Sequence, residues 1–378
     1  MKIAAEILAR PGLAPVMAAL AGGGHRALLV GGCVRNALLG APVTDIDIAT
    51  DARPDRVIAL AQAAGLKPVP TGIAHGTVTI VSQGAPHEVT TFRRDVETHG
   101  RHATVAFSTD IAEDAARRDF TMNALYAEAD GTVIDPLGGL ADLRARRLRF
   151  VGEAGARIRE DYLRILRFFR FHAWYADPAG GIDPEGLAAC AAGRDGIEGL
   201  SRERIGAEMK KLLSAADPAP AVAAMAQAGC LAPALPGADP RALAPLVSFS
   251  AETDPILRLA ALGGEDPATA LRLSRAEAKR LAALRDGATG LASPAVLGWR
   301  LGARDAAGAL ALRAALLGAP PLDAGSEIAR GAAAAFPLKA ADLARAGLAG
   351  PALGAALKAA EARWIASDLT ATRAQLLS

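Results

Sequence analysis

Two aspartates separated by one residue form the pair in this sequence best suited to chemistry. They are Asp45 and Asp47, in a segment that alternates polar and apolar residues up to Ile48. Residues two apart in a strand point to the same side, so both carboxylates would lie on one face. Neighbouring carboxylates repel each other unless a cation lies between them, and Mg²⁺ prefers oxygen ligands. The spacing therefore predicts a magnesium site, although an isolated pair of this kind is more often a solvated edge strand.

A glycine turn precedes the aspartates and could hold a phosphate. The apolar run 27–30 predicts a short buried strand that ends at Gly31 and Gly32. A helix is expected to follow over Val34–Leu39, and it carries Arg35. Backbone N–H groups at the start of a helix, together with a guanidinium, are suited to a phosphate. Metal-binding carboxylates and a phosphate-binding turn together indicate a catalytic site.

This part of the chain resembles a known signature. Residues 31–47 read GGCVRNALLGAPVTDID, which is similar to the pattern GGxVRDxLLGxxxxDxD of class II tRNA nucleotidyltransferases and poly(A) polymerases. The resemblance implies that Asp45 and Asp47 are catalytic metal ligands and that Gly32 and Arg35 bind the nucleotide. The sequence departs from the pattern at Asn36, where the family usually has Asp. Asn keeps the shape and the acceptor oxygen but loses the charge, so we expect Asn36 to have a structural role.

Two later segments resemble further elements of the same family. Residues 117–125, RRDFTMNAL, match RRDFTxNAL, and the resemblance implies that Arg118 and Asp119 contact the triphosphate and the ribose. Residues 158–172, IREDYLRILRFFRFH, repeat apolar side chains at helical spacing and contain the element EDxxRxxR. The implied nucleotide-binding residues there are Asp161, Arg164, Arg167 and Arg170.

Within that second segment, the residues divide between reading the base and binding the phosphates. A carboxylate accepts from an amino group and a guanidinium donates to ring nitrogens and carbonyls. Asp161 and Arg164, one helical turn apart, would thus read the Watson–Crick edge of the incoming base. Arg167 and Arg170 would face its phosphates or the rim of the nucleotide.

The charge pattern predicts a local RNA-binding surface. The formal net charge is only +2, so the chain as a whole has no strong positive field. Residues 144–170, however, contain nine arginines and three acidic residues. A basic block of this kind in a nearly neutral protein is where a polyanion is expected to bind.

Two other stretches of the first 142 residues leave their roles open. Glu88 alternates onto one face of a predicted strand, where it would be either a third carboxylate near the metals or a surface residue. Residues 93–105, RRDVETHGRHATV, are polar and without a period, which predicts a mobile loop.

The expected fold is an α/β nucleotidyltransferase head, with a small polymerase-beta-like sheet and helices, followed by an all-α neck, body and tail. We place the catalytic head at residues 1–142, a helical neck for nucleotide selection at 143–215, and a helical body and tail for tRNA binding at 216–378. No histidine follows His172, so the C-terminal part could not form a histidine-based metal phosphohydrolase domain.

The number and spacing of the cysteines and the N-terminal segment indicate the cellular compartment in which the protein is expected. Three widely spaced cysteines (Cys33, Cys190 and Cys230) match neither a disulfide framework nor a zinc site, which favours a reducing cytoplasm. Pro11 and Pro15 interrupt the apolar N-terminal segment, so a short helix is expected rather than a signal peptide or a membrane span. The oligomeric state is not indicated.

The resemblance implies template-independent CCA addition to the 3′ end of tRNA. CTP and ATP would supply CMP and AMP by two-metal-ion catalysis with Mg²⁺, and pyrophosphate would be released. The nearest alternatives are a poly(A) polymerase and an enzyme that adds only CC or only A. A non-catalytic RNA-binding derivative would be expected to have lost Asp45 or Asp47. A dinucleotide-binding oxidoreductase is excluded because the glycines near residue 31 do not form GxGxxG.

Overall fold

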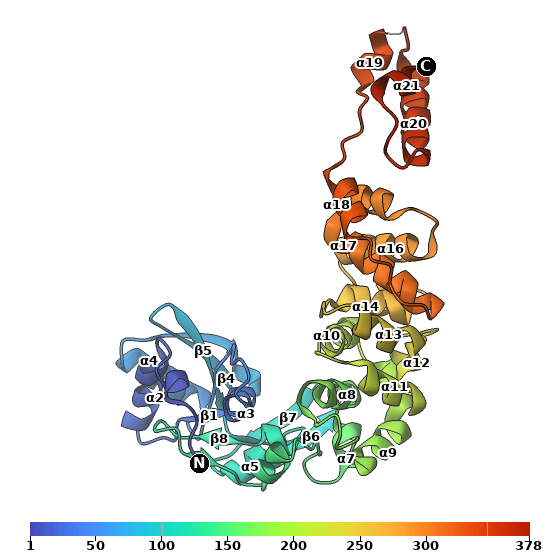
Figure 1. Cartoon of the computed structure of the whole chain (residues 1–378). Helices are drawn as coiled ribbons and strands as arrows, with labels where there is room; N and C mark the ends of the chain where they lie inside the picture. Colours follow the sequence, from blue (N-terminus) through green and yellow to red (C-terminus); the bar gives the residue numbers. More distant parts are fainter. Residues whose placement is uncertain (100–101, 346) are drawn as a thin grey trace. The chain divides into compact units, whose positions relative to one another are not determined.

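The chain folds into two compact units. The computed structural model describes residues 1–99, 102–345 and 347–378. One unit contains residues 1–200 and 227–233, and the other contains residues 201–226 and 234–378. The first combines a mixed sheet with helices and the second is helical (Figure 1). The predicted fold, an α/β head followed by helices, is confirmed, whereas the expected functional boundaries at residues 142 and 215 stay predictions.

A seven-stranded sheet with the order β3-β4-β5-β2-β1-β8-β9 organises the first unit. Strands β2 and β5 are parallel, and the other neighbouring pairs are antiparallel. The strands of this sheet are β1 Leu28–Val30, β2 Asp47–Thr50, β3 Lys67–Gly72, β4 Thr77–Ser82, β5 Ala85–Thr91, β8 Tyr126–Ala127 and β9 Val133–Ile134.

The sheet is covered by helices on the face where its apolar residues are buried. Val78 and Ile80 on β4 and Val89 on β5 are buried at alternating positions, as the period of two requires. Helices α2 and α4 contact β4 (Figure 1). The helices of the first unit are α1 Ala5–Leu8, α2 Leu13–Gly22, α3 Gly32–Leu39, α4 Pro54–Ala63, α5 Ile111–Ala116, α6 Gly139–Arg144, α7 Ala154–Glu160, α8 Leu163–Tyr175 and α9 Pro184–Gly193, with 3₁₀ turns η1 Ile73–His75, η2 Thr121–Asn123 and η3 Arg194–Gly199.

The prediction of a loop over residues 93–105 is wrong. Strands β6 (Arg93–His99) and β7 (His102–Phe107) pair as an antiparallel hairpin, with residues 100–101 outside the described range. Polar composition and a glycine indicated a loop, but β-branched residues such as Val96, Thr98 and Val105 favour an extended backbone.

The single helix expected over residues 158–172 is also wrong, because the backbone breaks at Asp161. Helix α7 ends at Glu160, Asp161 is extended, and α8 begins at Leu163. The Asp161 carboxylate accepts a hydrogen bond from the N–H of Leu163 at 3.1 Å. That bond satisfies one of the N–H groups that a helix start leaves without an internal partner.

The second unit is built from helices that follow one another along the chain. They are α10 Arg202–Leu213, α11 Ala219–Gln227, α12 Leu231–Ala234, α13 Leu243–Phe249, α14 Pro255–Leu262, α15 Pro267–Ala270, α16 Arg275–Thr289, α17 Pro294–Leu317, α18 Gly325–Ala333, α19 Ala340–Arg345, α20 Gly350–Ala366 and α21 Arg373–Leu377, with the 3₁₀ turn η4 Pro240–Ala242. Helices α11 and α12 cross the boundary between the two units. Among the described residues, every helix is too short or too polar to cross a lipid bilayer.

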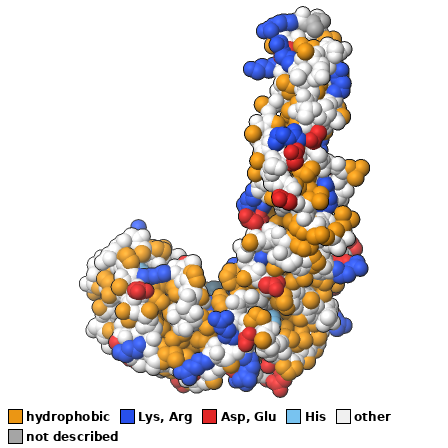
Figure 2. Space-filling view, viewed as in Figure 1, with side chains coloured by type: hydrophobic (Ala, Val, Ile, Leu, Met, Phe, Trp, Pro, Cys, Tyr) orange, Lys and Arg blue, Asp and Glu red, His pale blue; other side chains and the backbone are white. Residues whose placement is uncertain are grey.

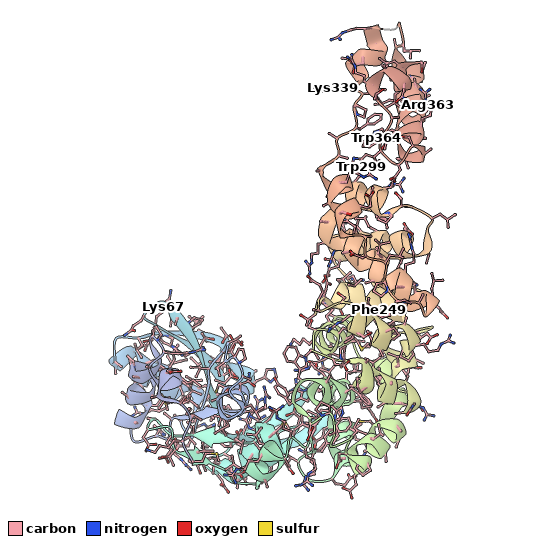
Figure 3. The ribbon with its side chains drawn as sticks, in the orientation of Figure 1. Lys67, Phe249, Trp299, Lys339, Arg363 and Trp364 are labelled. Atoms are coloured by element: carbon pink, nitrogen blue, oxygen red, sulfur yellow. The ribbon has the colours of Figure 1, made fainter. Side chains whose placement is uncertain are left out.

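Buried contacts join these helices to one another. Arg258 on α14 is 2% exposed and donates to the carbonyls of Leu213 (2.7 Å), Ala215 and Ala216 (3.0 Å) at the end of α10. Trp299 on α17 and Trp364 on α20 meet edge to face with ring centres 5.1 Å apart (Figure 3). On the face shown in Figure 2, Lys and Arg side chains of this unit are interspersed with Asp and Glu. Charge alone therefore does not mark an RNA surface on that face.

Candidate active site

Three carboxylates line one cavity beside two neighbouring strands of the sheet. Asp47 begins β2, and its register partner on the parallel strand β5 is Glu88. Asp45 lies just before β2, and all three residues line one cavity of about 700 Å³. Glu88 is exposed and lines the same cavity as the predicted metal pair, and its role as a third carboxylate at the metal site stays a prediction.

The electrostatics of Asp47 reflect this crowding. Partial burial raises the pKa of Asp47, and the negative charges of Glu88 and Asp45 raise it further, while Arg118 opposes them. A cation with oxygen ligands would relieve the repulsion, so Asp45 and Asp47 fit a divalent metal. Within the described ranges, no group of three or more His, Cys, Asp or Glu residues lies close enough together to hold a metal ion.

Side chains hold the loop that carries Asp45. The amide nitrogen Nδ2 of Asn36 donates to the carbonyl of Pro42 at 2.7 Å. Arg10 donates to the carbonyls of Val43 and Thr44, the latter at 3.0 Å. A carboxylate at position 36 would have no N–H to donate, so Asn makes a contact that Asp in ionised form could not make. The structural role expected of Asn36 agrees with this contact, whereas no sequence signal pointed to Arg10.

The glycine turn and Arg118 form a second part of the site. Gly31 has φ 73° and ψ −121°, a backbone conformation that side chains disfavour, and α3 begins at the next residue. A Cβ at Gly31 would lie 3.5 Å from Nη1 of Arg118. The other nitrogens of this guanidinium donate to Asp114 at 2.8 Å and Tyr126 at 3.1 Å. A helix start and a fixed guanidinium thus lie side by side, which suits an anion.

Arg35 is held by protein groups. It is 5% exposed and donates to the side chains of Asn36 (3.0 and 2.8 Å), Asn123 and Tyr175 (2.8 Å). Its guanidinium also lies 3.9 Å from the centre of the Tyr175 ring. Arg35 therefore joins α3 to the end of α8, and its predicted contact with the nucleotide stays a prediction. Tyr175 is a contact that sequence reasoning missed.

Asp119 and Arg167 form an ion pair between the segment before η2 and helix α8. Nε of Arg167 donates to Asp119 at 2.8 Å, and Asn123 donates to the same carboxylate at 2.9 Å. Burial alone would raise the pKa of Asp119, but the charge of Arg167 and these hydrogen bonds lower it to about 2. Asn123 thus links Asp119 to Arg35, and the predicted nucleotide contacts of Asp119 and Arg167 are untested.

The residues predicted to read the base lie at the start of α8. The Arg164 side chain donates to the carboxylate of Glu160 and to the carbonyl of Arg157 at 2.8 Å. The Asp161 carboxylate accepts a hydrogen bond from the backbone N–H of Leu163. The Arg170 guanidinium lies over the ring of Phe171, 4.3 Å from its centre. The roles of Asp161, Arg164 and Arg170 in nucleotide binding stay predictions.

Ion pairs within the first unit reduce the free positive charge of the basic block 144–170. Asp142 is fully buried and binds two arginines, and Glu160 binds two more. The arginines of the block that pair with carboxylates include Arg147, Arg149, Arg157, Arg159, Arg164 and Arg167. Arg144 and Arg146 are exposed and are the better candidates for contacts with RNA.

Comparison with known proteins places this site in a family. Residues 27–149 match the model of the poly A polymerase head domain, and residues 181–241 match that of the probable RNA and SrmB-binding site of polymerase A. The mitochondrial CCA tRNA nucleotidyltransferase 1 of Homo sapiens is 46% identical over 190 residues, 50% of this chain and 44% of that protein. The CCA-adding enzyme of Geobacillus thermodenitrificans is 44% identical over 216 residues, 57% of this chain and 52% of that enzyme. The chain thus matches about half the length of these curated relatives.

A solved structure extends the similarity over nearly the whole chain. The CCA-adding enzyme of Bacillus stearothermophilus, crystallised in complex with CTP, superposes with a TM-score of 0.74 at 30% sequence identity. The match covers 93% of this chain and 92% of that enzyme. The chain therefore belongs to the class II tRNA nucleotidyltransferase and poly(A) polymerase family, which includes the CCA-adding enzymes.

Proposed function

We propose that this protein is a template-independent CCA-adding tRNA nucleotidyltransferase. It transfers CMP and AMP from CTP and ATP to the 3′ end of tRNA. The observation that carries the proposal is the cavity shared by Asp45, Asp47 and Glu88, inside the region that matches the head-domain model. In the reaction, the 3′-oxygen of the RNA attacks the α-phosphorus of the nucleotide, and pyrophosphate leaves.

Asp45 and Asp47 are the residues we assign to metal binding. Enzymes of this family generally use divalent metals, and we propose Mg²⁺ because the available ligands are carboxylate oxygens. When bound, the metal would lower the pKa of the RNA 3′-hydroxyl and neutralise charge on the triphosphate. Glu88 adds negative charge to the same cavity and so favours cation binding.

The remaining proposed roles concern the nucleotide. Gly32 and Arg118 are proposed to orient the triphosphate, a role supported by the helix start at Gly32 and by the guanidinium of Arg118 beside Gly31. Asp161 and Arg164 are proposed to select the base, and α8 carries Arg167 and Arg170 further along the helix. Arg35 and Asp119 keep these elements in place through contacts within the protein.

The second unit is proposed to bind the rest of the tRNA. Its helical body and tail, from about residue 216, are suited to contacts with phosphates and with the shape of an RNA helix. We propose a cytoplasmic location, following the sparse cysteine content.

The carboxylate assignment is tested with Asp47→Ala. We expect incorporation of radiolabelled CMP into a tRNA transcript that lacks CCA to fall at least about 1,000-fold, because an oxygen ligand and its charge are lost. Binding of the same transcript, measured by filter retention, should stay within about twofold of the wild type. Substantial residual incorporation by Asp47→Ala would refute the assignment.

A further inference from the structure

Arg10 lies in an N-terminal segment that is packed tightly against the β4–β5 hairpin. Two residues later, Gly12 has φ +80°, and a Cβ there would lie 2.3 Å from the carbonyl oxygen of Ser82. The N–H of Gly12 donates to the side chain of Gln83 at 3.1 Å. The backbone next to Arg10 is therefore fixed to the turn that leads into β5, the strand that carries Glu88.

The side chain of Arg10 reaches a different element, the loop between α3 and β2. Residues 41–46 have no regular secondary structure, so their carbonyls need partners outside a helix or a ladder. Asn36 holds the carbonyl of Pro42, and the two ends of the Arg10 guanidinium hold those of Val43 and Thr44. Three consecutive carbonyls immediately before Asp45 are thus fixed by side chains.

Arg10 also lines the cavity that contains the carboxylates. Asp45, Asp47 and Glu88 share this cavity with it. Its contacts therefore connect the loop that carries one carboxylate to the hairpin that carries another. The residue lies outside the matched head-domain region, which begins at residue 27.

We infer that Arg10 is a positioning residue for the metal-binding carboxylates. By fixing the carbonyls of Val43 and Thr44, it sets where Asp45 stands relative to Asp47 and Glu88. The inference rests on the proposed function, because it assumes that these carboxylates bind the metal. The planar guanidinium presents its N–H donors to two adjacent carbonyls in a fixed geometry, whereas a lysine ammonium is a compact, strongly hydrated group on a flexible stem.

Whether replacing Arg10 strengthens or weakens metal binding distinguishes a positioning role from a purely electrostatic one. Removing a positive charge beside carboxylates would by itself strengthen cation binding. Loss of a residue that orients metal ligands instead weakens binding, typically by about 10–100-fold. A positioning role therefore predicts weaker metal binding in Arg10→Ala, although the variant has lost a cation.

The experiment measures Mn²⁺ binding by isothermal titration calorimetry with the full chain and without nucleotide or RNA. We expect the Kd for Mn²⁺ to rise about tenfold in Arg10→Ala and at least about threefold in Arg10→Lys. Arg56→Ala is the matched control, because Arg56 is an exposed arginine on α4 outside the cavity. It should bind Mn²⁺ like the wild type, and circular dichroism melting reports whether each variant is folded.

Steady-state kinetics give a second readout. At saturating Mg²⁺, Arg10→Ala should lower kcat for CMP incorporation about tenfold and leave KM for tRNA unchanged.

Unchanged or tighter Mn²⁺ binding in Arg10→Ala, or full recovery in Arg10→Lys, would overturn the positioning role. Asp47→Ala identifies the site in the same titration: if Mn²⁺ binding does not depend on Asp47, both the metal assignment and the role of Arg10 fail. Mn²⁺ binding that depends on Asp47 and Arg10, without any nucleotide incorporation by the wild type, would refute the proposed function alone.

Discussion

An arginine beside a catalytic site can either bind the substrate or hold the protein together, and its hydrogen bonds indicate which. Arg35 occurs in the signature where a phosphate contact was predicted, yet it is buried and donates to Asn36, Asn123 and Tyr175. Arg118 also pairs with protein groups, but its Nη1 lies beside the glycine turn. The contacts of Arg118 are thus the better match to an anion-binding role.

Replacing Arg35 separates these roles. We expect Arg35→Ala to lower the free energy of unfolding by about 2–4 kcal/mol, because it leaves several buried polar groups without their donor. Urea denaturation would measure this change, with the exposed Arg56→Ala as control. An unchanged unfolding free energy combined with a raised KM for CTP would instead show that Arg35 mainly binds the nucleotide.

At this scale the sequence was informative where the geometry is local. The spacing of Asp45 and Asp47 correctly predicted that they lie close together, but the expected shared strand face is wrong: β2 begins at Asp47, and Asp45 reaches the cavity from the preceding loop. The role of Arg10 could not be predicted, because it depends on two segments more than thirty residues apart in sequence meeting in space. Asn36 was recognisable as a departure, but its partner Pro42 became known only from the structure.

Among the elements, helix α8 is linked to η2 and α3 by a partly buried ion pair and the hydrogen bonds beside it. Asp119 binds Arg167 on α8 and Asn123 in η2, and Asn123 in turn binds Arg35 on α3. The helix that carries the proposed base-selecting Arg164 is thereby linked to the helix after the glycine turn.

Because of the ion pair between Asp119 and Arg167, the free energy of unfolding should depend on pH in the acidic range. The pKa of Asp119 is about 2 in the folded protein, below its ordinary value of 3.8. Its contribution, about 2 kcal/mol, is therefore present above pH 4 and is lost as the pH falls towards 2. We expect Asp119→Asn to be less stable than the wild type at pH 7 and the difference to shrink from pH 4 downward. Urea unfolding at pH 7 and pH 3 tests this, and a difference independent of pH would contradict it.

Helices and strands were predicted correctly where a run or repeat of apolar residues ended at a glycine. The strands and helices around the glycine turn follow from apolar runs ended by glycines. The hairpin β6–β7 was missed because its composition is polar, and the break before α8 was missed because apolar spacing continues across it. Both errors arose where a local backbone preference outweighed the pattern of hydrophobicity.

For the whole molecule, the resemblance of three short segments led to the family that the full-length comparison supports. The second unit could be predicted only as helical, since its helices carry no motif and their packing depends on buried contacts such as those of Arg258. Its proposed role in binding tRNA follows from the family rather than from a charged surface.

The proposed CCA-adding activity is tested most directly by determining which nucleotides the protein adds to RNA. The purified protein is incubated with Mg²⁺ and a tRNA transcript ending at the discriminator base, with CTP, ATP or both, and the 3′ ends are sequenced. We predict ordered addition of C, C and A followed by a stop, with addition halting after two C when ATP is omitted. Addition of only CC, only A, or a long A tract would contradict the proposed product, and no addition to any RNA would contradict catalysis itself.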